Sequence, residues 1–188
     1  MPGFQHEGSV DANALIVGHW AEIYATPLVG AALFVGSAQN GVLTIEREII
    51  EHKDTSFPRR TDMRIPVSVG MRFTADLDEV HAENMALVLG KDWTSAIVND
   101  EYNQNYLYFG ALDSPMYFGL HGTRRRPADK QWAEFHIHKA SAHGEVTVGG
   151  GDDFVGIPFE AVAHDDEAGT YGGSTAAPLG WINFPIKT

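Results

Sequence analysis

The sequence predicts a mainly β protein with one short α-helix at about 78–89 and a long loop at about 48–64. The strands are expected to form a two-sheet antiparallel β-sandwich or a barrel. Several segments alternate apolar and polar residues, which places the apolar side chains on one side of a sheet. Glycine, proline and asparagine turns separate those segments. A single segment combines the residues that start and stop a helix.

The chain has 188 residues and is expected to form a single domain, 1–188, with a core large enough to need no covalent cross-link. Its hydrophobic residues (44%) and charged residues (20%) match those of an ordinary soluble domain. The absence of cysteine excludes disulfides and thiolate metal sites. Residues 1–8 lack the basic and apolar regions of a signal peptide, and the longest apolar run, 27–36, is too short to span a bilayer. We therefore expect no membrane partner.

Two strands are expected on either side of the long loop. The first spans 42–50 and follows an Asn-Gly turn signal. The stretch 51–62 is highly charged and contains a proline, so it is expected to leave the core. In the second strand, at 64–74, apolar residues alternate with polar ones. The residues expected on its apolar face are Ile65, Val67, Val69, Met71 and Phe73.

A short helix is expected directly after the second strand. Asp76 and Glu79 have the spacing of a capping box, with Asp in place of the usual Ser or Thr, and Asp78 is a competing N-cap. Carboxylates at this end also suit the positive end of the helix dipole. Gly90 follows the last apolar run of the segment and is a natural C-cap residue.

The remainder of the chain is expected to contain further antiparallel strands joined by loops. Residues 92–105 and 165–178 are polar and predict long loops. In the strand expected at 132–140, Ala133 and Phe135 face the same side. Such strands would have exposed edges unless these are covered or paired with other subunits. Besides a short candidate at 22–24, the other strands are expected at 106–112, 116–120, 154–163 and 181–186.

The net charge of −12 arises from 13 basic and 25 acidic residues that are spread along the chain. A surface of this sign argues against a protein that grips phosphates, because such proteins need Lys and Arg to replace counterions. The charge fits a surface along which DNA passes without binding. It fits simple solubility as well.

Two histidines offer a candidate metal site. His136 and His138 are two residues apart on an expected strand, so both face the same side, and His143 follows. A His-x-His pair is how cupin-type metal sites begin. Glu145 lies too far along the chain for the carboxylate that such a site requires, and the second cupin motif is missing. A polar outer strand face beside Glu134 is the favoured interpretation, and no catalytic, cofactor-binding or metal-binding residue is assigned.

The order of these segments resembles the major tail tube proteins of long-tailed bacteriophages. Members of that family have a strand, a long hairpin-like loop, a strand and a short helix close to the motif E-N-x-A-x-x-L-G. In this chain the motif runs from Glu83 to Gly90, and 156–163 is similar to the family's penultimate strand. The matching segments, 42–90 and 156–163, make up roughly a third of the 188 residues.

The resemblance implies a structural virion protein without enzymatic activity or cofactor. Subunits would form hexameric rings, and the rings would stack into a tail tube around a tape-measure protein. Other partners would be the tail terminator, baseplate or tip proteins and, in a contractile tail, the sheath protein. DNA would pass through the lumen without specific binding. Assembly would take place in the host bacterial cytoplasm, and the protein would reside in the virion tail.

In the resembled family the long loop reaches the next ring and makes stacking contacts. Mixed charge around an aromatic residue suits a wet, oriented contact of that kind. Two alternatives stay open: a cupin-like metal-dependent enzyme or binding protein using His136 and His138, and a related tail β-protein such as a tail terminator or a secretion-system tube. The residues that the resemblance assigns to the stacking contact are Glu51, Lys53, Asp54, Phe57, Arg59, Arg60 and Asp62.

Overall fold

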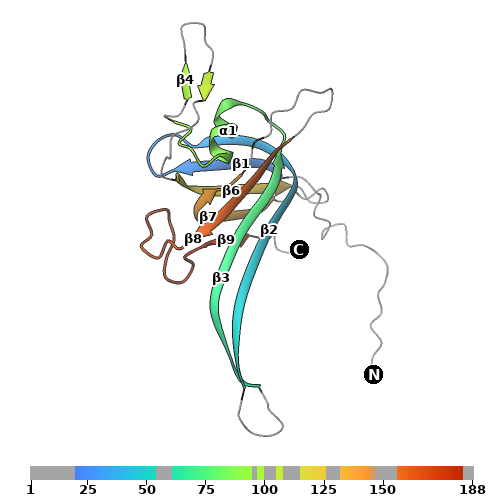
Figure 1. Cartoon of the computed structure of the whole chain (residues 1–188), viewed down its shortest axis with the longest axis vertical. Coiled ribbons are helices and arrows are strands. Elements are labelled where there is room, and N and C mark those ends of the chain that lie inside the picture. Colours follow the sequence, from blue (N-terminus) through green and yellow to red (C-terminus); the bar gives the residue numbers. More distant parts are fainter. Residues whose placement is uncertain are drawn as a thin grey trace, which may run out of the picture.

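The computed structural model describes residues 20–53, 61–94, 97–99, 105–107, 115–125, 132–144, 146 and 156–183. Within these ranges it places the side chains of all residues except 51–53, 61–67, 97–99, 105, 125 and 132. Figure 1 shows the arrangement of the elements. In chain order they are β1 (Trp20–Pro27), β2 (Leu33–Lys53), β3 (Thr61–Leu77), α1 (Ala82–Val88), β4 (Ile97–Asn99), β5 (Asn105–Leu107), β6 (Tyr117–Arg125), β7 (Trp132–Ala142), β8 (Ile157–His164) and β9 (Gly180–Asn183).

Seven strands form one antiparallel sheet in the order β6-β1-β2-β3-β8-β7-β9, and β6 also pairs with β7. That additional pairing closes all of them except β9 into a six-stranded barrel. β9 pairs with the segment Glu134–Ile137 of β7, beside the segment Lys139–Ala142 that pairs with β8. β4 and β5 form a separate pair. The predicted fold class, mainly antiparallel β with one short helix, is therefore confirmed in its barrel form.

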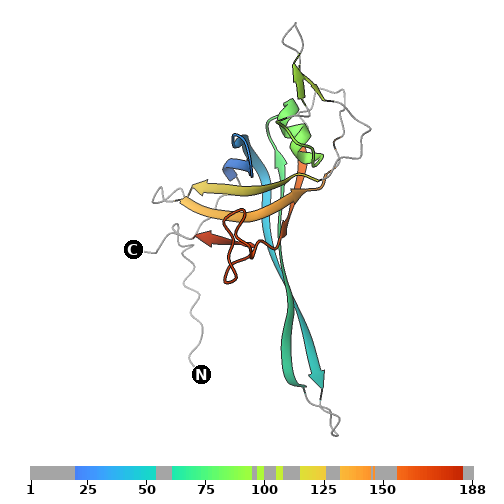
Figure 2. The ribbon, with the colours of Figure 1, turned by 90° about the vertical axis from the view of Figure 1, so that its left-hand side faces the viewer.

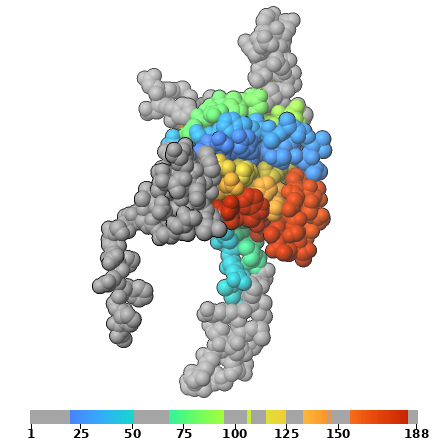
Figure 3. All heavy atoms as spheres, turned by 180° about the vertical axis from the view of Figure 1, so that it is seen from behind, coloured from blue at the N-terminus to red at the C-terminus, as the bar shows by residue number. Residues whose placement is uncertain are grey.

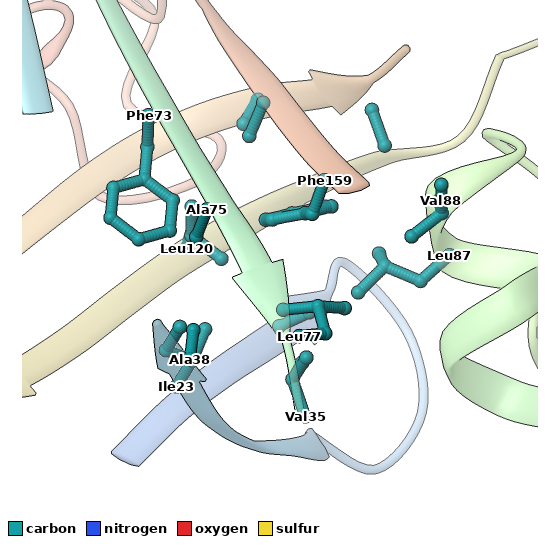
Figure 4. Packing of buried hydrophobic residues seen from close by; sticks show 14 of the residues in the cluster. Ile23, Val35, Ala38, Phe73, Ala75, Leu77, Leu87, Val88, Leu120 and Phe159 are labelled. Atoms are coloured by element: carbon teal, nitrogen blue, oxygen red, sulfur yellow. The ribbon is translucent and has the colours of Figure 1, made fainter. Parts of the chain in front are cut away.

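The barrel interior is filled by the alternating apolar residues of its strands. Figure 4 shows Phe73 and Leu77 of β3 beside Phe159 of β8. Met71 is also buried, so the predicted apolar face of β3 is confirmed over this part of the strand. Val69 lies on the same face but is 51% exposed, because β3 pairs with the barrel strand β8 only from Arg72 onward.

The helix α1 begins later than predicted. His81 is its N-cap, and its Nδ1 accepts a hydrogen bond from the backbone N–H of Asn84 at 3.4 Å. The predicted N-caps are wrong, because Asp76 is still paired within β3 and the Asp78 carboxylate accepts hydrogen bonds from side chains of β2. The predicted stop is confirmed, since Gly90 has a φ of 69° in the left-handed region that ends many helices.

The apolar face of α1 covers one end of the barrel. Leu87 and Val88 point toward the interior in Figure 4, and both are fully buried. The buried Asn84 fixes the helix to β2, because its Nδ2 donates to the carbonyl oxygens of Val35 (2.8 Å) and Glu79 (2.9 Å). Two backbone acceptors next to the core thus depend on one side chain.

Replacing Asn84 with alanine is expected to lower the free energy of unfolding by about 1–3 kcal/mol, because both carbonyls lose their donor in a buried position. Urea unfolding followed by circular dichroism would measure the change. Gln39→Ala serves as the control, since Gln39 is an exposed amide, and it is expected to change stability by at most about 0.5 kcal/mol. Equal stability losses for the two variants would contradict the anchoring role of Asn84.

Several strands run further than predicted. β2 and β3 extend into both ends of the loop predicted at 48–64, since they pair as far as Lys53 and Thr61. β4 lies within a stretch predicted as loop, because three residues are too few to give a readable period. Within the described ranges, no helix is long and apolar enough to cross a membrane.

Candidate self-assembly surface

β2 and β3 continue beyond the barrel as a two-stranded ribbon, which we call the arm (residues 42–53 and 61–71). Figures 1 and 2 show it leaving the barrel, and Figure 3 shows the same projection from behind. Among the described residues, β2 after Ala38 pairs only with β3, and β3 before Arg72 pairs only with β2. Both edges of the arm therefore carry backbone groups without a strand partner.

One face of the arm continues the apolar interior of the barrel. Ile45 lies opposite the buried Met71, and the next pair on this face is Arg47 with Val69. Ile45 is 56% exposed and Val69 51% exposed, and Ile49, further out on the same face of β2, is 46% exposed. Exposed apolar side chains grouped on one face in this way are typical of an interaction surface.

The opposite face of the arm is polar near the barrel. Arg72 bridges Glu46 at 2.7 Å and Glu160 of β8 at 3.4 Å, and Ser68 donates to Glu48 at 3.2 Å. Hydrogen bonding to Glu46 and Glu160 raises the pKa of Arg72 above its ordinary value. These ion pairs are open to water and add little stability. These side chains make this face of the arm charged and hydrated, whereas the opposite face is apolar.

A register shift alters the arm near its outer end. Between Glu48 and Ile49 the pairing gains one residue in β3, so that Ile49 lies opposite Pro66 and Ile50 opposite Ile65. Successive strand residues point to opposite faces, and both isoleucines are about half exposed. Beyond this bulge the arm therefore presents apolar side chains on both faces.

Three of the predicted stacking residues belong to the outer end of the arm. The main chain pairs Glu51 with Arg64 and Lys53 with Thr61, and Asp62 belongs to β3. Their side chains lie outside the described part of the structure. Asp54, Phe57, Arg59 and Arg60 lie entirely outside the described residues, so their predicted role stays a prediction.

The histidine pair lies on the outside of the barrel, as the alternation of β7 predicts. The ring of His136 stacks on Trp181 of β9 at 5.6 Å, with His138 at 5.0 Å and His121 of β6 at 6.1 Å. His143 does not join them, because its Nε2 is hydrogen-bonded to the Ser141 hydroxyl at 2.9 Å. No group of three or more His, Cys, Asp or Glu residues in the described part of the chain could hold a metal ion.

Burial lowers the pKa of His136 to about 4, and the neighbouring His138 and His121 contribute to the shift. Because the ordinary pKa is about 6.5, the unfolded chain takes up this proton first as the pH falls. We expect the wild type to lose more unfolding free energy between pH 7 and pH 4.5 than His136→Gln does. Urea unfolding at both pH values checks this, and equal losses would contradict it. An NMR titration should place the His136 midpoint near 4.

The sequence predicts a contact at seven residues of the long loop, but it does not predict the exposed apolar residues of the arm. Ile45 and Val69 have the pattern of ordinary core residues, and nothing in their spacing shows where the barrel stops covering them. The fold and this surface define the class of the protein: an antiparallel β-barrel with a projecting amphipathic arm. Comparison with protein-family models and with curated proteins found no match for the chain.

Proposed function

We propose that this protein is a structural subunit that assembles with copies of itself, as the major tail tube protein of a long-tailed phage or phage-like particle. The proposal is carried by the arm, which exposes apolar side chains continuous with the barrel interior between two open strand edges. A two-stranded ribbon is marginally stable in water on its own. A neighbouring copy would bury the apolar face and pair the edges.

The arm and the barrel suit a head-to-tail contact, in which the arm of one copy meets a different surface of the next. Contacts of this kind generate closed rings or open filaments. In a tube of stacked hexameric rings, lateral contacts between subunits would close each ring. The outer end of the arm would reach the next ring and extend the tube. The order of segments that resembles tail tube proteins favours this arrangement.

The proposed role lies in geometry and charge and needs no catalytic residue. A chain with net charge −12 would line a tube that repels phosphate and keeps DNA mobile. The tape-measure protein would occupy the tube during assembly, with terminator, baseplate or tip proteins at its ends and a sheath protein around it in a contractile tail. The subunit would assemble in the host bacterial cytoplasm and remain in the virion tail.

Negative-stain electron microscopy of the concentrated protein, with light scattering for its mass, tests the proposal directly. Rings or hollow tubes, together with a mass that rises with concentration, are the expected result. Monomer mass at every concentration, with neither rings nor tubes, would contradict unaided self-assembly.

Replacing Phe57, Arg59 and Arg60 with alanine is expected to block tube growth while leaving the barrel folded, since the loop would lose its aromatic and its positive charges. Tube yield by microscopy and the circular dichroism spectrum give the two readouts. An unchanged tube yield would rule out the stacking role of this loop.

A further inference from the structure

Residues 165–183, which we call the strap, lie outside the barrel. They comprise the loop after β8 and the strand β9, which the barrel does not include. Figure 2 shows the strap, in red, beside β7. Among the described residues β9 pairs only with β7, over the segment 134–137. Leu179 and Ile182 pack against the core, so a short ladder and a few apolar contacts hold the strap closed.

The strap covers a cluster of three histidines on the outer face of the barrel. The Trp181 ring of β9 stacks on His136 at 5.6 Å and lies 6.3 Å from His121 of β6. The backbone N–H of His138 donates to the carbonyl oxygen of Leu179 at 2.9 Å. The His136 ring lies 5.0 Å from His138 and 6.1 Å from His121, so protons on these rings would place like charges close together.

One of these histidines has an unsatisfied nitrogen while the strap is closed. His138 is only 6% exposed, and its Nδ1 has no hydrogen-bond partner among the described residues. The loop of the strap passes over this atom, since a Cβ added at Gly172 would lie 3.6 Å from it. A buried polar atom without a partner costs free energy, and that cost ends when water reaches the atom. Hydration of Nδ1 therefore makes opening of the strap easier.

The barrel strands contribute further titratable groups around the cluster. Glu134 lies on the same face of β7, two residues before His136. Tyr24 of β1 lies opposite the β6 histidine. The Lys139 ammonium is turned to the Tyr117 ring, 4.7 Å from its centre. On the barrel side, β7 thus places one carboxylate on the face that carries three imidazoles.

The strap supplies its own titratable groups only from the loop, because β9 has none. The Asp166 carboxylate accepts hydrogen bonds from the backbone N–H groups of Tyr171 at 2.8 Å and Gly173 at 2.9 Å. The Tyr171 hydroxyl donates to a carbonyl oxygen of β6 at 3.3 Å. The other carboxylates of the loop, Asp165 and Glu167, are exposed. The bonds to Asp166 fold the loop on itself, so that the strap can move as one piece.

We infer that the strap is an acid-released cover, held on β7 while His121, His136 and His138 are neutral and released when they take up protons. Opening hydrates the three rings and lets their charges be screened by water. It also uncovers the edge of β7 at 134–137, which β9 pairs with in the closed form. An uncovered edge of this kind is available to another strand. The inference concerns the strap alone and does not rest on the proposed assembly.

Proton uptake by His136 determines the expected size of the effect. Burial lowers the pKa of His136 to about 4 in the closed form, and His138 and His121 lower it further. In the open form the hydrated ring returns toward the ordinary pKa of about 6.5. The closed form therefore keeps its full stability above about pH 6.5 and loses stability as the pH falls toward 4. Between pH 7 and pH 5 the open fraction is expected to rise about twentyfold.

Hydrogen exchange of the full-length chain at pH 7 and pH 5, corrected for the intrinsic rate at each pH, tests the release. Opening of the amides in β9 is expected to rise about twentyfold at pH 5, while the amides of β8 keep their protection. His136→Gln should reduce the rise to less than about fivefold. The matched control His143→Gln, a histidine outside the cluster, should leave the rise unchanged. Unchanged exchange of β9, an equal rise throughout the barrel, or a full rise in His136→Gln would overturn the inference.

A disulfide provides a second measurement within one variant. The chain has no cysteine, and Glu134 lies opposite Asn183 in the pairing of β7 with β9. Opposite residues on antiparallel strands have Cα atoms about 4.5–5.5 Å apart, within the range a disulfide spans. In Glu134→Cys with Asn183→Cys, the oxidised protein is expected to lose the rise at pH 5 and the reduced protein to keep it. An equal rise in both forms would overturn the inference, because exchange would then not require β9 to leave β7.

Discussion

Lysine at both Ile45 and Val69 is expected to abolish self-association while the barrel stays folded. Both side chains lie on the apolar face of the arm and are about half exposed, so lysine there costs the monomer little. In an assembled interface the same two charges would be buried without partners, and each would cost several kcal/mol. Light scattering would report a monomer mass at concentrations where the proposed assembly predicts larger species for the wild type.

The matched control adds the same two charges to the other face of the arm. Thr44 and Ser68 lie on that face, where Arg72 and Glu48 already stand in water. Lysine at both positions is expected to leave the wild-type mass distribution in place. If the two double variants dissociate equally, net charge controls association and the apolar face has no special role.

Replacing Phe135 with alanine is expected to cost about 3–5 kcal/mol of unfolding free energy. Its fully buried ring packs edge-to-face on Trp20 at 4.7 Å and lies 4.8 Å from Phe73, so truncation leaves a cavity among aromatic groups. A domain is typically stable by about 5–15 kcal/mol, so this one change removes a large share. The midpoint of urea unfolding would measure it.

Phe34→Ala makes the same chemical change on the outside of the barrel. Phe34 is 45% exposed and contacts the Tyr24 ring at 5.1 Å. Its removal is expected to cost about 1 kcal/mol, the value of an exposed aromatic pair. A loss of unfolding free energy as large as that of Phe135→Ala would contradict the difference in burial between the two positions.

Much of the fold could be predicted from local pattern. The alternation of Ala133, Phe135 and Ile137 identified the buried face of β7, and the positive φ of Gly90 follows from its place after an apolar run. The start of the helix could not be predicted in the same way. Asp76 has a favourable capping-box spacing, yet its pairing opposite Gln39 keeps it in the sheet.

The exposure of the apolar residues on the arm could not be predicted from the sequence pattern. A period of two shows which residues share a face, but burial depends on how many neighbouring strands reach that point. Met71 and Val69 have the same pattern, and they differ in exposure because β8 pairs with β3 only from Arg72 onward. For His136, the alternation was correct, but its environment is set by Trp181, which a distant strand supplies.

The pairing of the strands also bears on the order in which the chain folds. β2 and β3 are consecutive and joined by a short connection, so their ribbon needs only a local loop to close. The barrel also needs the pairing of β1 with β6, where Ile23 lies opposite Gly122, and pairings between residues so distant in sequence form slowly. The arm is therefore expected to form before the barrel. During synthesis, nascent chains would display the apolar ribbon early, so that under the proposed assembly the rate of barrel formation sets how long premature association competes with folding.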